Sequence, residues 1–411
     1  MHLRCLAIIL SCFILPLRGE EPPLSAEALA GALRTSGLPT GEESVTVPLE
    51  STFLGFIVEA QINGQSVQLL LDSGAACTLL SPEIARQLGL QTNGPKESAS
   101  SADGGSVVGL RTLTKRFSLG SAWTENEPVF IAEMIPGIQG LLGMATLADW
   151  DVRIDPSTRK LTLFPAGKAP SQEGETVLPL TCQRKSTSAG MPKGQGFHMM
   201  NLTVPLHVGT HELAATPDTG HGTILQLPST LIEKMAPQAL KDALPALATA
   251  VTLSGKTMSR EAKLREVTFG PDTLHGLRTN IIDAPPGSNA ESKGLIGLNL
   301  LRHYVMTFRF SVGELRLKPL GTVQEITSAA TAGIYMDLEN KILNVLPNGP
   351  ADKAGLRIGD EVLEIEGHPL KTMTPEKFAA FKRLPPGTAV KVRYRRGELS
   401  PMEATLVLMK E

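Results

Sequence analysis

The sequence predicts a mainly β protein with two related lobes followed by a small α+β domain. Its 411 residues exceed the length of one ordinary domain. It contains 39 Gly and 30 Pro but only 4% aromatic residues, a composition typical of short strands joined by turns rather than of a helical bundle. The order of its motifs also recurs once along the chain, which indicates a duplicated unit.

The chain starts with a predicted secretory signal peptide, residues 1–19. Arg4 precedes an apolar run from Cys5 to Leu17, and a polar break follows Gly19. The alternative is an ordinary N-terminal helix. The run is too short to span a bilayer comfortably, and no later segment reaches the length of a membrane helix. We therefore expect an exported protein, periplasmic or secreted, without a transmembrane segment after signal removal.

Changes in composition predict the boundaries that follow. Residues 20–45 are rich in Pro, Gly, Ser and Glu and are interpreted as a linker or a removable pro-segment. From about Val45, short apolar runs alternate with turns that contain Gly or Asn. The expected organisation is then a first lobe over 46–168, an inter-lobe connection over 169–196, a second lobe over 197–324 and a C-terminal domain over 325–411.

The two predicted lobes share one order of motifs. "VEAQINGQSVQLLLDSGAACTLLSPEIARQLGL" begins at Val58, and "LTVPLHVGTHELAATPDTGHGTILQLPSTLIEKM" begins at Leu202. Both predict strand, tight turn, strand, Asp-Ser/Thr-Gly, strand and a short helix. Each lobe then carries a second matching block, which starts with "GLLG" at Gly140 and with "GLIG" at Gly294. We interpret the chain as a duplicated lobe.

Asp72 needs a partner because it ends an apolar run. A carboxylate in such surroundings costs several kcal/mol unless it is paired or neutralised. Two Asp-Ser/Thr-Gly triplets, each followed by hydrophobic-hydrophobic-Gly, resemble the aspartic peptidases over about residues 48–320. The lobe size is similar to that of the retropepsin type, here with two lobes in one chain as in pepsin-like enzymes. The resemblance implies two retropepsin-like β-barrel lobes and peptide hydrolysis.

In that family two carboxylates meet, which makes Asp218 the candidate partner of Asp72. Like charges about 3 Å apart cannot both ionise, so the pair shares one proton. The ionised member then activates water while the protonated member polarises the scissile carbonyl, with activity expected on the acid side of neutrality. The supporting residues are two hydroxyls that cross-link the loops and four glycines that allow tight turns or close strand approach: Ser73, Thr219, Gly74, Gly220, Gly143 and Gly297.

The resemblance also implies a β-hairpin flap between each triplet and its hydrophobic-hydrophobic-Gly element. Residues 101–109, "SADGGSVVG", fit the first flap, with Gly104 and Gly105 at its tip. Residues 253–257, "LSGKT", fit the second flap. Neither segment contains an aromatic residue.

The second triplet departs from the family pattern. Pro217 precedes it, although proline cannot donate to a strand ladder, and His221 follows it in place of a small residue. Two alternatives to the dyad therefore stay open: a non-catalytic peptide-binding or scaffold protein with a degenerate second lobe, and a homodimeric peptidase that uses Asp72 from each chain. Either Asp is otherwise a turn carboxylate that caps its own backbone.

The C-terminal residues 325–411 closely resemble a PDZ domain, especially the bacterial periplasmic kind. The segment 348–367, "NGPADKAGLRIGDEVLEIEG", carries the resemblance, and an amphipathic helix is expected over 373–384, where Phe378 and Phe381 line the groove or the core. The family binds a peptide C-terminus or an extended segment as an added strand. A PDZ domain that packs on the protease and binds no peptide is the alternative. By resemblance, the carboxylate-binding loop consists of Gly333, Ile334, Tyr335 and Met336.

The remaining features point away from other chemistries. A formal net charge of −2 with no basic excess argues against nucleic-acid binding. His207 and His211 lie in a strand-turn-strand pattern and not on one helix face, so neither a metal site nor any cofactor is implied. After signal removal, Cys77 and Cys182 remain, either as one disulfide or as two unpaired buried thiols. The expected partners are protein or peptide substrates and a peptide ligand of the PDZ domain.

Overall fold

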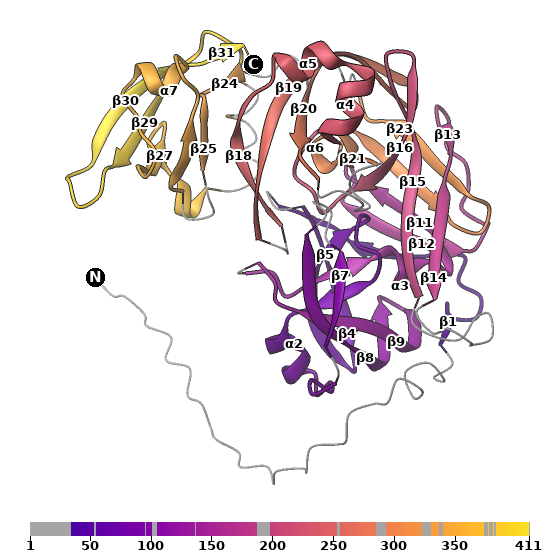
Figure 1. The fold of residues 1–411 in the computed structure, drawn as a ribbon. Helices are drawn as coiled ribbons and strands as arrows, with labels where there is room; N and C mark the ends of the chain where they lie inside the picture. Colours follow the sequence, from indigo (N-terminus) through magenta and orange to yellow (C-terminus); the bar gives the residue numbers. More distant parts are fainter. Residues whose placement is uncertain are drawn as a thin grey trace, which may run out of the picture.

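A computed structural model provides the structure of the chain (Figure 1). The structure describes residues 34–52, 55–94, 96–100, 105–135, 137–186, 198–252, 255–284, 293–321, 323, 330–336, 340–373, 377, 381 and 384–410. The predicted signal peptide, residues 1–19, lies outside the described residues.

The first lobe is a closed ring of strands. Strand β9 pairs with β6 on one side and with β8 on the other, so that the order β9-β6-β10-β5-β4-β8 returns to β9. The ring consists of β4 (Phe56–Ile62), β5 (Gln65–Asp72), β6 (Thr78–Leu80), β8 (Ser106–Leu119), β9 (Ala122–Ala132) and β10 (Gly140–Gly143). It is flanked by β1 (Thr35–Gly37), β3 (Glu50–Ser51), β7 (Lys96–Ser100) and the short helices α2 (Pro82–Gln87) and α3 (Met144–Leu147).

The second lobe repeats the ring strand for strand, in the order β15-β16-β21-β17-β20-β19, and β19 pairs back with β15. The predicted duplication is therefore visible in the pairing itself. The strands are β15 (His198–Val208), β16 (His211–Asp218), β17 (Leu225–Pro228), β19 (Gly255–Phe269), β20 (Asp272–Ile282) and β21 (Gly294–Gly297). The flanking elements are β14 (Thr181–Ser186), β18 (Leu244–Thr252), α4 (Ser229–Met235), α5 (Pro237–Lys241) and α6 (Leu298–Leu301).

The apolar pattern of the sequence explains the ring. In β4 every second side chain is buried, as expected for a strand with one face on the core. Leu69 and Leu71 of β5 are fully buried, and they lead directly into Asp72. The apolar strand β6 ends at Leu80, and Ser81 directly after it caps α2 by accepting a hydrogen bond from the N–H of Ile84 at 3.2 Å.

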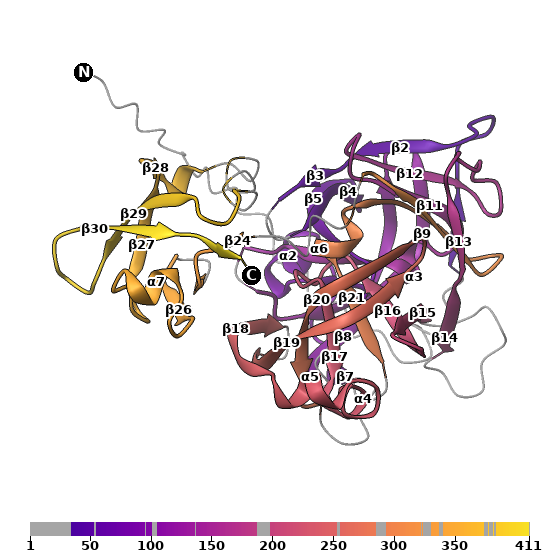
Figure 2. The same cartoon turned by 90° about the horizontal axis from the view of Figure 1, so that it is seen from above.

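A six-stranded sheet joins the lobes (Figures 1 and 2). One hairpin comes from each lobe, and β11 pairs with β22 so that Asp151 faces Arg309. Asp151 is fully buried; its carboxylate accepts hydrogen bonds from the N–H groups of Gly167 and Ala169, both at 3.0 Å, and from Nε of Arg309 at 3.2 Å. The strands in order are β13 (Thr176–Pro179), β23 (Glu314–Pro319), β22 (Tyr304–Arg309), β11 (Trp150–Asp155), β12 (Lys160–Pro165) and β2 (Val45–Pro48).

Two segments that the sequence indicated as connections contain strands. In residues 20–45, expected as a linker or pro-segment, β1 pairs with β9 and so belongs to the first lobe. In residues 169–196, expected as an inter-lobe connection, β13 joins the six-stranded sheet and β14 pairs with β15. The sequence did not indicate these strands, because strands of three to six residues at sheet edges are too short to give a hydrophobic period in turn-rich sequence.

The C-terminal domain has its own hydrophobic core, separate from the core of the two lobes. A short helix begins at Pro350, and Gly355 after it has φ +81°. Of the helix expected over 373–384, Lys377 and Phe381 are described and helical, and Phe381 packs against this core. The elements are β24 (Ala330–Thr331), β25 (Ile334–Met336), β26 (Ile342–Val345), α7 (Pro350–Lys353), β27 (Glu361–Ile365), β28 (His368–Pro369), the 3-10 helix η3 (Leu370–Thr372), β29 (Ala389–Arg395), β30 (Met402–Val407) and β31 (Met409–Lys410).

Neither remaining cysteine forms a disulfide. Cys77 is buried and Cys182 is half-buried. Burial raises the pKa of Cys77 to about 12, which keeps this thiol protonated and unreactive. Within the described ranges, no helix combines the length and apolar character needed to cross a membrane.

We predict that Asp151→Ala destabilises the two-lobed unit by roughly 3–5 kcal/mol, because it leaves the buried Arg309 cation without one of its carboxylates. The free energy of unfolding from denaturant titration measures this loss. Glu125→Gln is the matched control, since the pair of Glu125 with Arg116 is about half exposed and such pairs contribute less than about 1 kcal/mol. Equal stability of the two variants would contradict the role given to the inter-lobe pair.

Candidate active site

The two triplets lie at equivalent places in the two rings. Strand β5 ends at Asp72 and β16 ends at Asp218. Each aspartate lies beside a glycine on a parallel neighbour: Gly143 of β10 faces Asp72, and Gly297 of β21 faces Asp218. A Cβ atom on either glycine would come within 2.3 Å of a backbone carbonyl oxygen, so only glycine allows this close approach.

Reciprocal hydrogen bonds hold the triplets together. The N–H of Ser73 donates to Oγ1 of Thr219 at 3.0 Å, and the N–H of Thr219 donates to Oγ of Ser73 at 2.9 Å. Each hydroxyl then donates to a carbonyl of the other lobe: Ser73 to Pro217 at 2.7 Å and Thr219 to Leu71 at 2.7 Å. Both side chains are buried, so four satisfied hydrogen bonds fix the relative position of the loops.

This cross-link brings the carboxylates face to face. A Cβ atom added to Gly74 would meet the carboxylate of Asp218 at 2.3 Å, and one added to Gly220 would meet the carboxylate of Asp72 at 2.4 Å. Each glycine therefore makes room for the acid of the opposite lobe. The structure thus brings together the two aspartates and all six supporting residues that the sequence predicted.

The surroundings of the carboxylates favour one shared proton. Oδ1 of Asp72 accepts hydrogen bonds from the N–H groups of Gly74 and Ala75, both at 2.9 Å, and Oδ1 of Asp218 accepts one from Gly220 at 2.9 Å. Burial and the neighbouring Asp218 raise the pKa of Asp72 well above its usual range. Burial likewise raises the pKa of Asp218 to about 6. One carboxyl of the pair is therefore protonated where an ordinary aspartate is ionised.

The unusual flanks of the second triplet fit this geometry. Pro217 lies on β16, and its carbonyl is the acceptor for the hydroxyl of Ser73. The Nε2 atom of His221 lies 3.0 Å from Oε1 of Gln226, and its backbone N–H lies 3.4 Å from the carbonyl oxygen of Asp218. Neither residue prevents the two loops from meeting.

The expected flaps fall on hairpins. Strands β7 and β8 pair antiparallel up to Ser100 and Ser106, and the expected tip lies between them in sequence. Gly105 is described and half-buried, whereas Gly104 lies outside the described residues. In the second lobe, β18 and β19 form the equivalent hairpin, closed by the pair Thr252 and Gly255.

The predicted carboxylate-binding loop leads into β25. Gly333 is buried with φ +70°, a conformation that favours glycine, and its N–H donates to Oγ1 of Thr331 at 3.1 Å. Ile334, Tyr335 and Met336 form β25, which pairs with β26; the side chain of Tyr335 is not described. Both strands lie against β18 of the second-lobe hairpin (Figure 1).

The sequence did not identify Thr78, the residue that fixes Gly143. The N–H of Gly143 donates to Oγ1 of Thr78 at 3.2 Å, and Oγ1 of Thr78 lies 2.6 Å from Oγ1 of Thr146. A hydroxyl in the apolar run "CTLL" was the available signal, because a buried hydroxyl requires a partner. Across the described part of the chain, no group of His, Cys, Asp and Glu is arranged to hold a metal ion.

Two family models match the chain, one in the first lobe and one in the C-terminal domain. A family model described as aspartyl protease matches residues 58–146, and one described as PDZ domain matches residues 341–396. The crystal structure of an aspartic proteinase from Irpex lacteus is similar at 15% identity with a TM-score of 0.43, over 68% of this chain and 99% of that chain. No curated protein matches. The chain therefore contains an aspartyl protease domain in its first lobe and a PDZ domain at its C-terminal end.

Proposed function

We propose that this chain is an exported aspartic endopeptidase in which Asp72 and Asp218 form one intramolecular dyad. The observation that carries the proposal is the reciprocal bonding of Ser73 and Thr219, because it holds two carboxylates from one chain against each other. Export rests on the N-terminal apolar run of the sequence. The PDZ domain would bind a peptide C-terminus or an extended segment of the substrate or of a partner.

The dyad would use both protonation states at once. The ionised carboxylate takes a proton from a water molecule as its oxygen attacks the scissile carbonyl carbon. The protonated carboxyl donates a hydrogen bond to the carbonyl oxygen and stabilises the charge that develops there. Transfer of a proton to the amide nitrogen then lets the C–N bond break, and the products are an acid and an amine. These roles require two acids that share one proton, which the burial of the pair supports.

The position of the PDZ domain supports a role in substrate recruitment. Strands β25 and β26 lie against β18, and β18 belongs to the hairpin at the place of the second flap. A substrate segment held on the PDZ domain would therefore have a high effective concentration near the dyad.

We predict that Asp72→Asn and Asp218→Asn each lower kcat by about 100-fold to 10,000-fold, because each removes one half of the acid–base pair. Cleavage of an unfolded protein substrate measures this loss, with circular dichroism to verify that each variant is folded. Survival of activity in Asp218→Asn would favour the homodimer that uses Asp72 from each chain. If the unaltered protein cleaves no substrate, even after removal of the segment before Arg34, the non-catalytic scaffold is the better account.

The raised pKa values predict a shifted pH profile. At a pH below the lower pKa both carboxyls are protonated and no base is present; above the higher pKa both are ionised and no acid is present. Since the pKa of Asp218 is about 6 and that of Asp72 is also raised, kcat/KM should rise as the pH passes through about 6. The sequence predicts activity on the acid side of neutrality, and this rise in kcat/KM lies at the neutral end of that range. An acid limb at the ordinary aspartate pKa would contradict the effect of burial.

We also predict that a free peptide with an apolar C-terminus competes with protein substrates for the PDZ domain. It should raise KM for an unfolded protein several-fold, because recruitment contributes only to binding. It should leave the cleavage of a short peptide substrate unchanged, since such a substrate has no segment to reach the PDZ domain. An equal effect on both substrates would instead indicate binding of the competitor in the cleft.

A further inference from the structure

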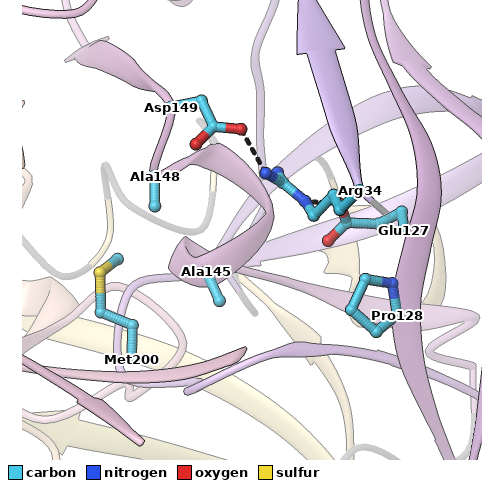
Figure 3. Close-up of a pocket in the computed structure, with 7 residues that line it drawn as sticks. All are labelled: Arg34, Glu127, Pro128, Ala145, Ala148, Asp149 and Met200. Carbon is cyan, nitrogen blue, oxygen red and sulfur yellow. Dashed lines mark hydrogen bonds and ion pairs between the residues drawn. The ribbon is translucent and has the colours of Figure 1, made fainter. Parts of the chain in front are cut away.

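A partly buried cluster of charges ties the N-terminal strand to the first lobe. Arg34 lies directly before β1, and its Nε donates to Oε2 of Glu127 at 2.6 Å. Its Nη1 bonds to the carboxylate of Asp149, and its Nη2 donates to the carbonyl oxygen of Thr146 at 2.9 Å. The hydroxyl of Ser36 donates to Asp149 at 2.6 Å. All three nitrogens of one guanidinium therefore have a partner. Figure 3 shows the two ion pairs, with Glu127 and with Asp149.

The surroundings make this contact more than a surface ion pair. The side chain of Glu127 is 2% exposed and that of Arg34 is 14% exposed. Burial disfavours the cation, but Glu127 and Asp149 outweigh this effect and raise the pKa of Arg34 above its usual value, so it stays charged. The three charged residues line a small pocket, together with Pro128, Ala145, Ala148 and Met200 (Figure 3).

Hydrogen bonds connect Arg34 to the loop of Asp72, Ser73 and Gly74, here called the first catalytic loop. Arg34 holds the carbonyl of Thr146 in α3, the helix that begins directly after Gly143. The hydroxyl of Thr146 lies 2.6 Å from the hydroxyl of Thr78, which accepts the N–H of Gly143 at 3.2 Å. Gly143 in turn faces Asp72 on the neighbouring parallel strand. Three links thus separate a residue of the N-terminal segment from the glycine that packs beside the first aspartate.

Among the described residues of the second lobe, the corresponding network is absent. By the strand registers and the helix positions, Leu225 and Leu300 occupy the places of the two threonines, and both are fully buried. The N–H of Gly297 donates instead to the backbone carbonyl of Ile224 at 3.0 Å. The N–H of Gly143 is therefore held by a hydroxyl and the N–H of Gly297 by a backbone carbonyl, so the fold can form without a hydroxyl link at this position.

We propose that Arg34 is a positioning residue for the first catalytic loop. It acts on Asp72 through Thr146, Thr78 and Gly143, and not by contact with the reacting atoms. The inference rests on the proposed function, because it assigns to Arg34 a part in setting the geometry of that dyad. The segment directly before β1 would then affect catalysis, although its sequence resembles a linker.

The test is steady-state kinetics of Arg34→Gln in the full mature chain. We expect kcat to fall by about 10-fold to 100-fold, because a small misplacement of one reacting group is sufficient for such a loss. KM should change by less than about twofold, since no substrate contact is removed. The acid limb of the pH profile of kcat should also move, because the spacing of the two carboxyls sets how they share a proton. Arg116→Gln is the matched control: its ion pair with Glu125 is about half exposed, and kcat and the pH profile should stay unchanged.

Further variants separate positioning from folding. Thr78→Val and Thr146→Val keep the ion pairs of Arg34 but break the hydroxyl link, and each should lower kcat at unchanged KM. Arg34→Lys keeps the charge but loses the fork of donors, so we expect intermediate activity. In the double variant Arg34→Lys/Thr78→Val, the loss of kcat should be smaller than the product of the single losses, as for residues that act through one path.

The outcomes distinguish this inference from the proposed function. If the unaltered chain cleaves its substrate while folded Arg34→Gln keeps the same kcat and pH profile, the positioning role is wrong and the dyad stands. If Arg34→Gln does not fold and both Thr→Val variants keep full kcat, Arg34 serves stability alone and the inference is likewise overturned. If the unaltered chain does not cleave at all, both proposals fail together.

Discussion

The close approach of Asp72 and Asp218 depends on the contact between Ser73 and Thr219. Two like-charged carboxylates do not come together spontaneously, and their burial adds a further cost. Four hydrogen bonds between the two loops oppose this repulsion, and two glycines leave the space in which each acid faces its partner. Burial raises the pKa values of both aspartates, and the neighbouring Asp218 adds to the rise at Asp72. The proposed chemistry would therefore depend on a buried pair of acids that neutral hydroxyls hold in place.

The rest of the fold serves to hold the two loops in register. Each ring ends one strand at an aspartate and supports it with a parallel strand that ends in glycine. The six-stranded sheet then joins the rings through the buried pair of Asp151 and Arg309. The lobes are nevertheless not equivalent, because only the first is tied by a charged cluster to the N-terminal strand. This asymmetry suggests that the first loop needs additional constraint.

Much of the site was predictable because its parts recur in the sequence. A repeated Asp-Ser/Thr-Gly followed by a repeated hydrophobic-hydrophobic-Gly identifies residues that each lobe brings together in the same way. The cluster around Arg34 was not predictable, since Arg34 and Glu127 lie 93 residues apart and Arg34 lies in a turn-rich segment. The strands β1 and β13 were missed for a related reason: their stability comes from a partner strand that is distant in sequence and not from their own hydrophobic period.

The proposed mechanism requires that both acids of the dyad belong to one chain. The most direct test measures the specific activity of the unaltered mature protein against an unfolded substrate over a wide dilution series. An intramolecular dyad predicts a specific activity that does not depend on protein concentration. A fall in specific activity on dilution, in parallel with the loss of a dimer in sedimentation velocity, would contradict the claim and assign catalysis to two copies of Asp72.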